Sequence, residues 1–142
     1  MQKYSHNIGN LLARALQKWN KHLVTAFEQA GFFDIKPSYG AIFILLFEAD
    51  GLPISAIIER SSLSKQTISG YLRELKNKHY VEISKSEKDE RAMKIYLAPK
   101  GKNFKRVATK ILTEMNRNIY KSLGKQQCSQ LQELLSKYLS IK

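Results

Sequence analysis

The sequence predicts a mostly helical α+β fold, in which a winged helix-turn-helix lies between long helices at the two ends of the chain. A short amphipathic stretch follows a tight polar turn at residues 61–64. Two segments in which apolar and polar residues alternate come soon after it, as in half-buried strands. Long stripes of apolar residues at helical spacing flank this centre on both sides. Helix-turn-helix, hairpin and flanking helices together define the predicted fold.

Composition limits the classes of partner. The chain has 142 residues, with 24 Lys and Arg against 12 Asp and Glu, a net charge of +12. Such an excess favours a polyanion, either nucleic acid or an anionic membrane surface. The longest apolar run, residues 41–47, is too short to span a bilayer. Cys128 has no second cysteine to pair with, and the amino terminus does not resemble a signal peptide. We therefore expect a soluble cytoplasmic protein.

Two helices are predicted before the central motif. The first carries apolar residues at three- and four-residue steps and ends near Ala30–Gly31, where Gly suits a left-handed cap. The second runs from about Pro37 to Glu48, with Pro at its first position, and Asp50–Gly51 ends it. The stripe of the first helix consists of Ile8, Leu11, Leu12, Ala15, Trp19, Leu23 and Phe27.

A helix-turn-helix is predicted between residues 55 and 76. Ser55 is expected to cap a short helix that ends near Arg60, and residues 61–64 form the turn. Ser64 is expected to cap the next helix, because its hydroxyl can accept from the amides of the first turn. The apolar positions 68, 72 and 75 of that helix fall on one side. The opposite side carries hydrogen-bond donors: Lys65, Gln66, Ser69, Arg73 and Lys76.

A wing is predicted directly after this helix. Residues 80–85 and 93–97 alternate apolar and polar side chains, and the seven residues between them are almost all polar. We interpret these segments as a β-hairpin.

Two further helices are predicted, from Pro99 to Leu123 and from about Lys125 onward. Their apolar stripes, like that of the first helix, exceed what one small winged domain can cover, which predicts a homodimer. The expected division is 1–36 for an amino-terminal dimerisation helix and its connection, 37–99 for the DNA-binding domain and 100–142 for the carboxyl-terminal dimerisation helices.

Motifs in these segments resemble the MarR family of winged-helix transcriptional regulators. Asp89-Glu90-Arg91, followed by Leu97-Ala98 and then Gly101, is similar to the family's D-x-R and L-T-x-x-G. Further similarity lies in Lys36-Pro37, residues 57–63, the start of the second helix of the motif, and Tyr80-Val81. The chain departs from the pattern at four positions. Ala98 replaces Thr, His79 replaces Gly, and Ile58 and Ser62 occupy sites that are commonly Ala and Gly.

Roles on DNA follow from groove geometry and from the resemblance. Residues near the start of the recognition helix reach deepest into the major groove, where Gln suits adenine and Lys suits guanine. The expected base contacts are Lys65, Gln66, Thr67 and Ser69, and the expected phosphate contacts are Arg73, Lys76, Lys88 and Lys94. The resemblance implies that Arg91 enters the minor groove while Asp89 orients it. Residues 52–106 hold +7 of the total charge of +12.

The resemblance also implies an effector crevice between the dimerisation helices and the winged domain. The candidate lining residues are Trp19, Tyr39, Phe43 and Phe47, for which the alternative is a place in the core. Cys128 is interpreted as a small buried apolar residue, not as a redox sensor. The three His residues lack metal-ligand spacing, so neither a metal nor another cofactor is expected.

The sequence leaves open three functions from different classes. The leading one is a homodimeric, sequence-specific DNA-binding regulator, a repressor that reads a pseudo-palindrome and is released by a small-molecule effector. The alternative is a winged-helix protein-interaction module, which would be indifferent to duplex DNA. An enzyme is disfavoured because no nucleophile, base and orienting group cluster, and an electrostatic membrane binder is the remaining alternative.

Overall fold

The computed structural model describes residues 3–85 and 93–142. The chain forms two compact units, Met1–Val107 and Ala108–Lys142, so that the boundary falls within one long helix. Each unit is described by itself below.

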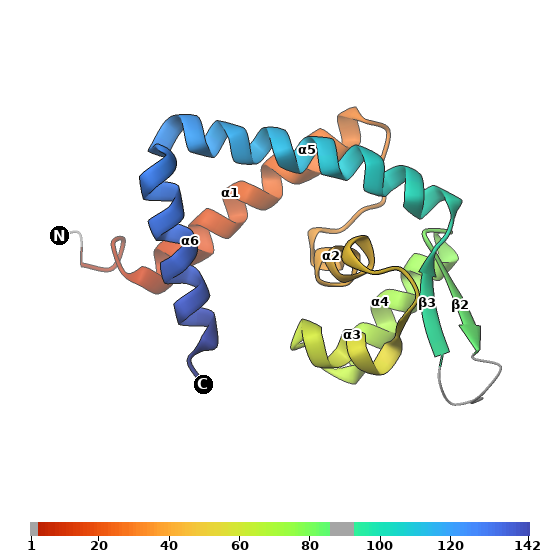
Figure 1. Ribbon diagram of the computed structural model, residues 1–142. Helices are drawn as coiled ribbons and strands as arrows, with labels where there is room; N and C mark the ends of the chain where they lie inside the picture. Colours follow the sequence, from red (N-terminus) through yellow and green to blue (C-terminus); the bar gives the residue numbers. More distant parts are fainter. Residues whose placement is uncertain (1–2, 86–92) are drawn as a thin grey trace. The chain divides into compact units, whose positions relative to one another are not determined.

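The first unit contains the winged helix-turn-helix (Figure 1). Its described elements are, in order, α1 (Ile8–Gln29), the 3-10 helix η1 (Pro37–Tyr39), α2 (Gly40–Glu48), β1 (Leu52–Pro53), α3 (Ile54–Ser61), α4 (Lys65–Asn77), β2 (Val81–Lys85), β3 (Met93–Leu97) and the start of α5 (Pro99–Leu123). The strands form an antiparallel sheet in the order β1-β3-β2. The predicted α+β fold is confirmed.

The predicted helix boundaries agree closely with the observed ones. Asn7 caps α1 by accepting a hydrogen bond from the amide of Gly9 at 2.8 Å, and Gly31 follows the helix with a φ of 94°. The predicted second helix begins at Pro37 as a 3-10 turn and continues as α2. Ser55 does not cap α3, which corrects one prediction. Pro53 is the capping residue instead, and Ser55 lies inside the first turn.

An aromatic cluster forms the centre of the first unit. The Phe104 ring lies 5.0 Å from the Phe27 ring and 4.8 Å from the Phe43 ring, measured between centroids. Phe32 and Tyr80 are also within 6 Å of Phe104. Aromatic pairs at these separations and tilted angles add to the free energy gained by burial. The cluster therefore joins α1, α2, the start of β2 and the start of α5.

A short strand that was not predicted completes the sheet. Leu52 pairs with Ile95, and the amide of Gly51 donates to the carbonyl of Ile95 at 3.0 Å. The Asp50 carboxylate accepts from the amide of Leu97 at 2.8 Å. Gly51 has a φ of 79°, and a Cβ there would overlap the Tyr96 ring, so any other residue would be strained at this position. Asp50-Gly51 thus ends α2 and also anchors the root of the wing.

The wing is fastened to α5 through Tyr80. The amide of Ala98 donates to the carbonyl of Tyr80 at 2.9 Å, just before α5 begins at Pro99. A Cβ on Gly101 would overlap that carbonyl oxygen. Gly101 therefore lets the first turn of α5 lie directly against the backbone that leads into β2.

The second unit contains the rest of α5 and α6 (Lys125–Ser140). Gly124, with a φ of 89°, separates the two helices. Cys128 is buried, as predicted, and its thiol lies 3.7 Å from the carbonyl of Ile119. Several large apolar side chains of this unit stay exposed: Ile119, Tyr120, Leu123, Leu131, Leu134, Leu135, Tyr138, Leu139 and Ile141. No helix of the described residues is both long and apolar enough to cross a bilayer.

Candidate DNA-binding interface

Side-chain hydrogen bonds fix the turn between α3 and α4. The Ser61 hydroxyl accepts from the amide of Leu63 at 3.3 Å, and Ser62 takes a left-handed conformation with a φ of 60°. The Ser64 hydroxyl accepts from the amide of Thr67 at 3.1 Å and donates to the Thr67 hydroxyl at 2.8 Å. The predicted cap at Ser64 is confirmed, and these bonds set where α4 begins.

One side of α4 is buried and the other is available to a ligand. Ile68, Leu72 and Leu75 are almost completely buried, as their spacing predicted. Lys65, Gln66, Arg73 and Lys76 are exposed, and Thr67 and Ser69 are half-buried. Gly70 lies among them, and a Cβ there would meet nothing within 4 Å. We call Lys65, Gln66, Ser69, Arg73 and Lys76 the donor face of α4.

The side chains of the donor face are not held by other described residues. Within residues 3–85 and 93–142, none of its five side chains forms a hydrogen bond or an ion pair. No bond to another residue of the described chain therefore has to break before these donors bind an external acceptor. The spacing of these residues in the sequence predicted that they lie on one face of a helix, and in the structure they do lie on one face of α4.

Strands β2 and β3 form the predicted hairpin, with Val81 opposite Leu97 and Lys85 opposite Met93. Lys85 is exposed and Lys94 is half-buried. Lys88, Asp89 and Arg91, to which the sequence assigned DNA contacts, lie outside the described residues. Their roles remain predictions.

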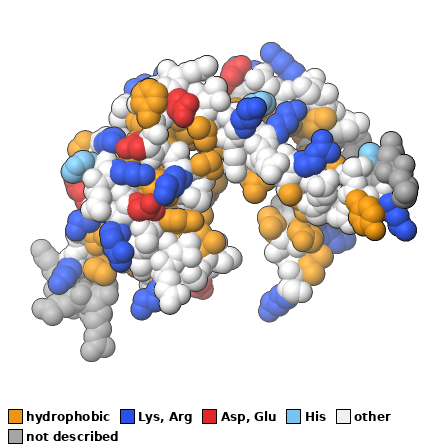
Figure 2. Space-filling model, turned by 180° about the vertical axis from the view of Figure 1, so that it is seen from behind, with side chains coloured by type: hydrophobic (Ala, Val, Ile, Leu, Met, Phe, Trp, Pro, Cys, Tyr) orange, Lys and Arg blue, Asp and Glu red, His pale blue; other side chains and the backbone are white. Residues whose placement is uncertain are grey.

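Positive charge is spread over one face of the protein. Figure 2 shows Lys and Arg side chains scattered over one face among neutral and hydrophobic ones, without a single dominant patch. Such a distribution provides general attraction for a polyanion. Sequence selection would then depend on the local donor face.

A group of polar residues that the sequence did not predict to lie together is found at the other end of α4. We call Asp34, Tyr39, Lys78, Tyr80 and Lys100 the Asp34 cluster. The Tyr80 hydroxyl donates to the Asp34 carboxylate at 2.6 Å. Lys78 donates to the carbonyl of Asp34 at 3.0 Å and to the Tyr39 hydroxyl at 2.8 Å. These partners are far apart in the sequence, so periodicity gave no signal for them.

Lys100 completes the Asp34 cluster. Its ammonium lies 3.5 Å from the Asp34 carboxylate, donates to the carbonyl of Lys78 at 3.0 Å and sits 4.3 Å from the Tyr80 ring centroid. Burial opposes ionisation of Asp34, but the hydrogen bond from Tyr80 and the charge of Lys100 outweigh it and hold the pKa of Asp34 below its usual value. Burial and the Asp34 carboxylate raise the pKa of Tyr80 far above its usual value.

The candidate effector residues occupy different environments. Tyr39 and Phe43 are buried: Phe43 belongs to the aromatic cluster around Phe104, and Tyr39 packs edge-on against Tyr71. Trp19 and Phe47 are half-buried. Their role in binding an effector remains a prediction.

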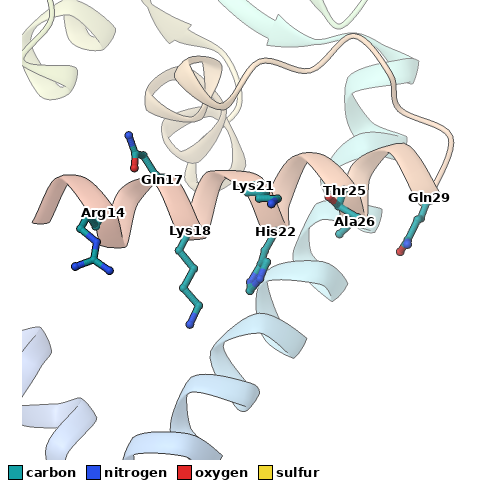
Figure 3. Close-up of a pocket in the computed structure, with 8 residues that line it drawn as sticks. All are labelled: Arg14, Gln17, Lys18, Lys21, His22, Thr25, Ala26 and Gln29. Atoms are coloured by element: carbon teal, nitrogen blue, oxygen red, sulfur yellow. The ribbon is translucent and has the colours of Figure 1, made fainter. Parts of the chain in front are cut away.

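A separate hollow runs along α1. It is lined by Arg14, Gln17, Lys18, Lys21, His22, Thr25, Ala26 and Gln29. Figure 3 shows Arg14, Lys18 and His22 pointing to the same side of the helix. The lining contains three permanent cations and no acidic residue, so it favours an anionic group.

In the described residues, no three His, Cys, Asp or Glu side chains lie close enough together to hold a metal ion.

Comparisons with known proteins identify the fold. No family model matches the sequence. A curated relative, the exopolysaccharide II synthesis transcriptional activator ExpG of Rhizobium meliloti, is 25% identical over 95 residues. The match covers 67% of this chain but 48% of ExpG, so the chain spans about half the length of that relative.

Three solved structures match nearly the whole chain. The transcriptional repressor CouR, bound to a 23-mer DNA duplex, has a TM-score of 0.84 at 18% identity, covering 98% of this chain and 96% of its own. The PcaV regulator of Streptomyces coelicolor, in complex with its natural ligand, has a TM-score of 0.81 at 18% identity, covering 95% and 93%. A MarR transcriptional regulator from Methanosarcina mazei has a TM-score of 0.77 at 20% identity, covering 93% of each chain.

The fold and the donor face define a winged helix-turn-helix protein. Its fold is that of the MarR transcriptional regulators, as the motifs in the sequence predicted.

Proposed function

We propose that the chain is a MarR-family regulator that binds double-stranded DNA sequence-specifically as a homodimer. The observation that carries this proposal is the donor face of α4, which is exposed except for the half-buried Ser69 and has no partner in the described chain. A helix of this kind fits the major groove, with its amino-terminal residues directed at base edges. CouR, which has the same fold, is bound to a DNA duplex in its structure.

The proposed homodimer would use the apolar residues left exposed on the long helices. On α1 these are Ile8, Leu11 and Leu16, and on α6 they include Leu131 and Leu134. An apolar stripe of this length is unusual on a monomer surface and is typical of an interface. In such a dimer, the two α4 helices would address half-sites about one helical turn (~34 Å) apart.

Selection of duplexes from a random pool, followed by sizing of the protein and of its complex, tests this proposal. We expect a two-fold symmetric consensus bound by one dimer. Recovery of no preferred sequence, together with binding that is insensitive to salt, would instead support the protein-interaction module, because contacts with phosphates make DNA affinity fall as salt rises.

We further propose that binding represses transcription, because a dimer that covers a promoter excludes the polymerase. The curated relative is named as an activator, and CouR is named as a repressor. In vitro transcription from a promoter that contains the selected sequence shows whether the protein represses or activates transcription. Repression predicts less transcript as protein is added, and an increase would make the chain an activator.

Release by a small-molecule effector completes the proposal. PcaV is described in complex with its natural ligand, and the hollow along α1 offers Arg14 and Lys18 to an anion. We expect small carboxylates to weaken DNA binding more than their neutral amides do. The Arg14→Gln variant should reduce that difference. If acids and amides weaken DNA binding of the wild-type protein equally, the α1 hollow is not the effector site.

A further inference from the structure

The carboxyl-terminal end of α4 is tied to the segment that joins α1 to η1. Asp34 and Tyr39 come from that segment and its helix, whereas Lys78 and Tyr80 directly follow α4. Lys78 reaches the Asp34 carbonyl and the Tyr39 hydroxyl, while Tyr80 reaches the Asp34 carboxylate. All of these residues belong to the first unit.

Two further contacts support this connection. Lys36 donates to Glu74, in the last turns of α4, at 2.8 Å. The ammonium group of Lys100, at the start of α5, donates hydrogen bonds both to the Asp34 carboxylate and to the carbonyl of Lys78. The carbonyls near the end of a helix lack partners within the helix, so a cation placed there is stabilising.

The position of this network suggests what it does. Its residues lie at the end of α4 opposite the Ser64 cap, so they are away from the predicted base contacts. They can therefore influence DNA binding by setting the direction of α4 relative to α1. The Tyr80 ring is fully buried in the aromatic core, so the orientation of its hydroxyl is fixed by packing.

We propose that Asp34 is a positioning residue for DNA recognition, which fixes α4 relative to the α1 connection through Tyr80, Lys78 and Lys100. The inference rests on the proposed function, because its effect is on the spacing of two recognition helices in a dimer. Loss of the Asp34–Tyr80 hydrogen bond should leave the donor face intact but let each α4 helix vary in direction.

Tyr80→Phe and Asp34→Asn test this proposal. Tyr80→Phe keeps the buried ring and removes only the hydroxyl, and Asp34→Asn removes the charge. Matched controls are Tyr96→Phe, which removes a hydroxyl that has no hydrogen-bond partner in the described chain, and Glu28→Gln, which makes the same charge change on exposed α1.

The probe is the duplex that the wild-type protein selects from a random pool, compared with duplexes in which one or two base pairs are inserted between the half-sites. The wild type should prefer the original spacing strongly. Tyr80→Phe and Asp34→Asn should each lose about five- to tenfold in affinity for the original spacing and discriminate less against the longer ones, while dimerisation and binding to unrelated DNA stay unchanged. Both controls should behave as the wild type.

A variant that combines Asp34→Asn with Tyr80→Phe provides a second test. Its affinity for the selected duplex is compared with the affinities of the two single variants. If Asp34 and Tyr80 act through one hydrogen bond, the combined loss of affinity should be smaller than the product of the two single losses. Folded variants with wild-type affinity and spacing preference, or losses that simply multiply, would overturn the positioning role. Failure of the wild type to select any symmetric duplex would instead overturn the proposed function.

Discussion

Gly101→Ala tests whether α5 packs against the backbone of Tyr80 as closely as the structure shows. In a helix, replacing Gly by Ala ordinarily stabilises the fold by about 0.5–1 kcal/mol. At Gly101, however, the added Cβ would overlap the Tyr80 carbonyl oxygen and lie 3.2 Å from the Leu97 side chain. Relief requires the first turn of α5 to move away from Tyr80.

That movement has two costs. It weakens the hydrogen bond from the Ala98 amide to the Tyr80 carbonyl, which is 2.9 Å long, and an unsatisfied buried polar group costs about 1–3 kcal/mol. Overpacking adds about 1–3 kcal/mol. After the helix-propensity gain of about 0.5–1 kcal/mol is subtracted, Gly101→Ala should lower the free energy of unfolding by about 1–5 kcal/mol.

Gly70→Ala is the matched control, because Gly70 is also inside a helix but has open space around it. It should raise the free energy of unfolding by about 0.5–1 kcal/mol. Equilibrium urea unfolding, followed by the fluorescence of the single Trp19 and by circular dichroism at one protein concentration, measures both variants. Wild-type stability in Gly101→Ala would refute the close packing.

Further predictions concern the donor face and the Asp34 cluster. Ser64→Ala should lower the free energy of unfolding by about 1 kcal/mol in urea titrations, because the amide of Thr67 loses its cap. A wild-type midpoint would contradict the capping role. Gln66→Ala should cost about 1–3 kcal/mol on the selected duplex and little on unrelated DNA, as measured by fluorescence anisotropy. Equal losses on both would argue against base contact. Arg73→Ala should weaken binding to all duplexes and reduce the log-log salt slope by about 1 unit, and an unchanged slope would exclude a phosphate contact. The lowered pKa of Asp34 means that its carboxylate stabilises the fold above its unfolded pKa, near 3.8, and that this stability is lost as the pH falls through the lower folded value. Because the Asp34 side chain is 40% exposed, the contribution should stay below about 1 kcal/mol. Urea midpoints measured down the acid range should fall less in Asp34→Asn, and parallel curves would contradict this linkage.

Local patterns were sufficient to predict most of the helices and both long strands. The stripe at Ile68, Leu72 and Leu75 correctly predicted which side of α4 is buried, and Ser64 correctly predicted where it begins. The cap at Ser55 was wrong because the backbone is extended at Pro53 and helical from Ile54, so the helix begins before Ser55. Strand β1 is only two residues long, so it has no periodicity to detect.

The functional surface was predictable only where it lies on one element. The donor face is encoded by the spacing of residues along α4, so the sequence predicted it as a unit. The Asp34 cluster joins positions 34, 39, 78, 80 and 100, which only the folded chain brings together. Tyr39 and Tyr80 were noted in the sequence for other reasons, and the three charged members looked ordinary, because isolated charged residues are common in any domain.

The central claim is that two copies of this chain present their α4 helices to two halves of one symmetric DNA site. Its most direct test is the affinity and stoichiometry of binding to the selected duplex and to a duplex with one half-site scrambled, measured by anisotropy and light scattering. The account predicts one dimer on the intact duplex and a loss of affinity of at least about tenfold when one half is scrambled. A monomer bound with equal affinity to both duplexes would contradict it.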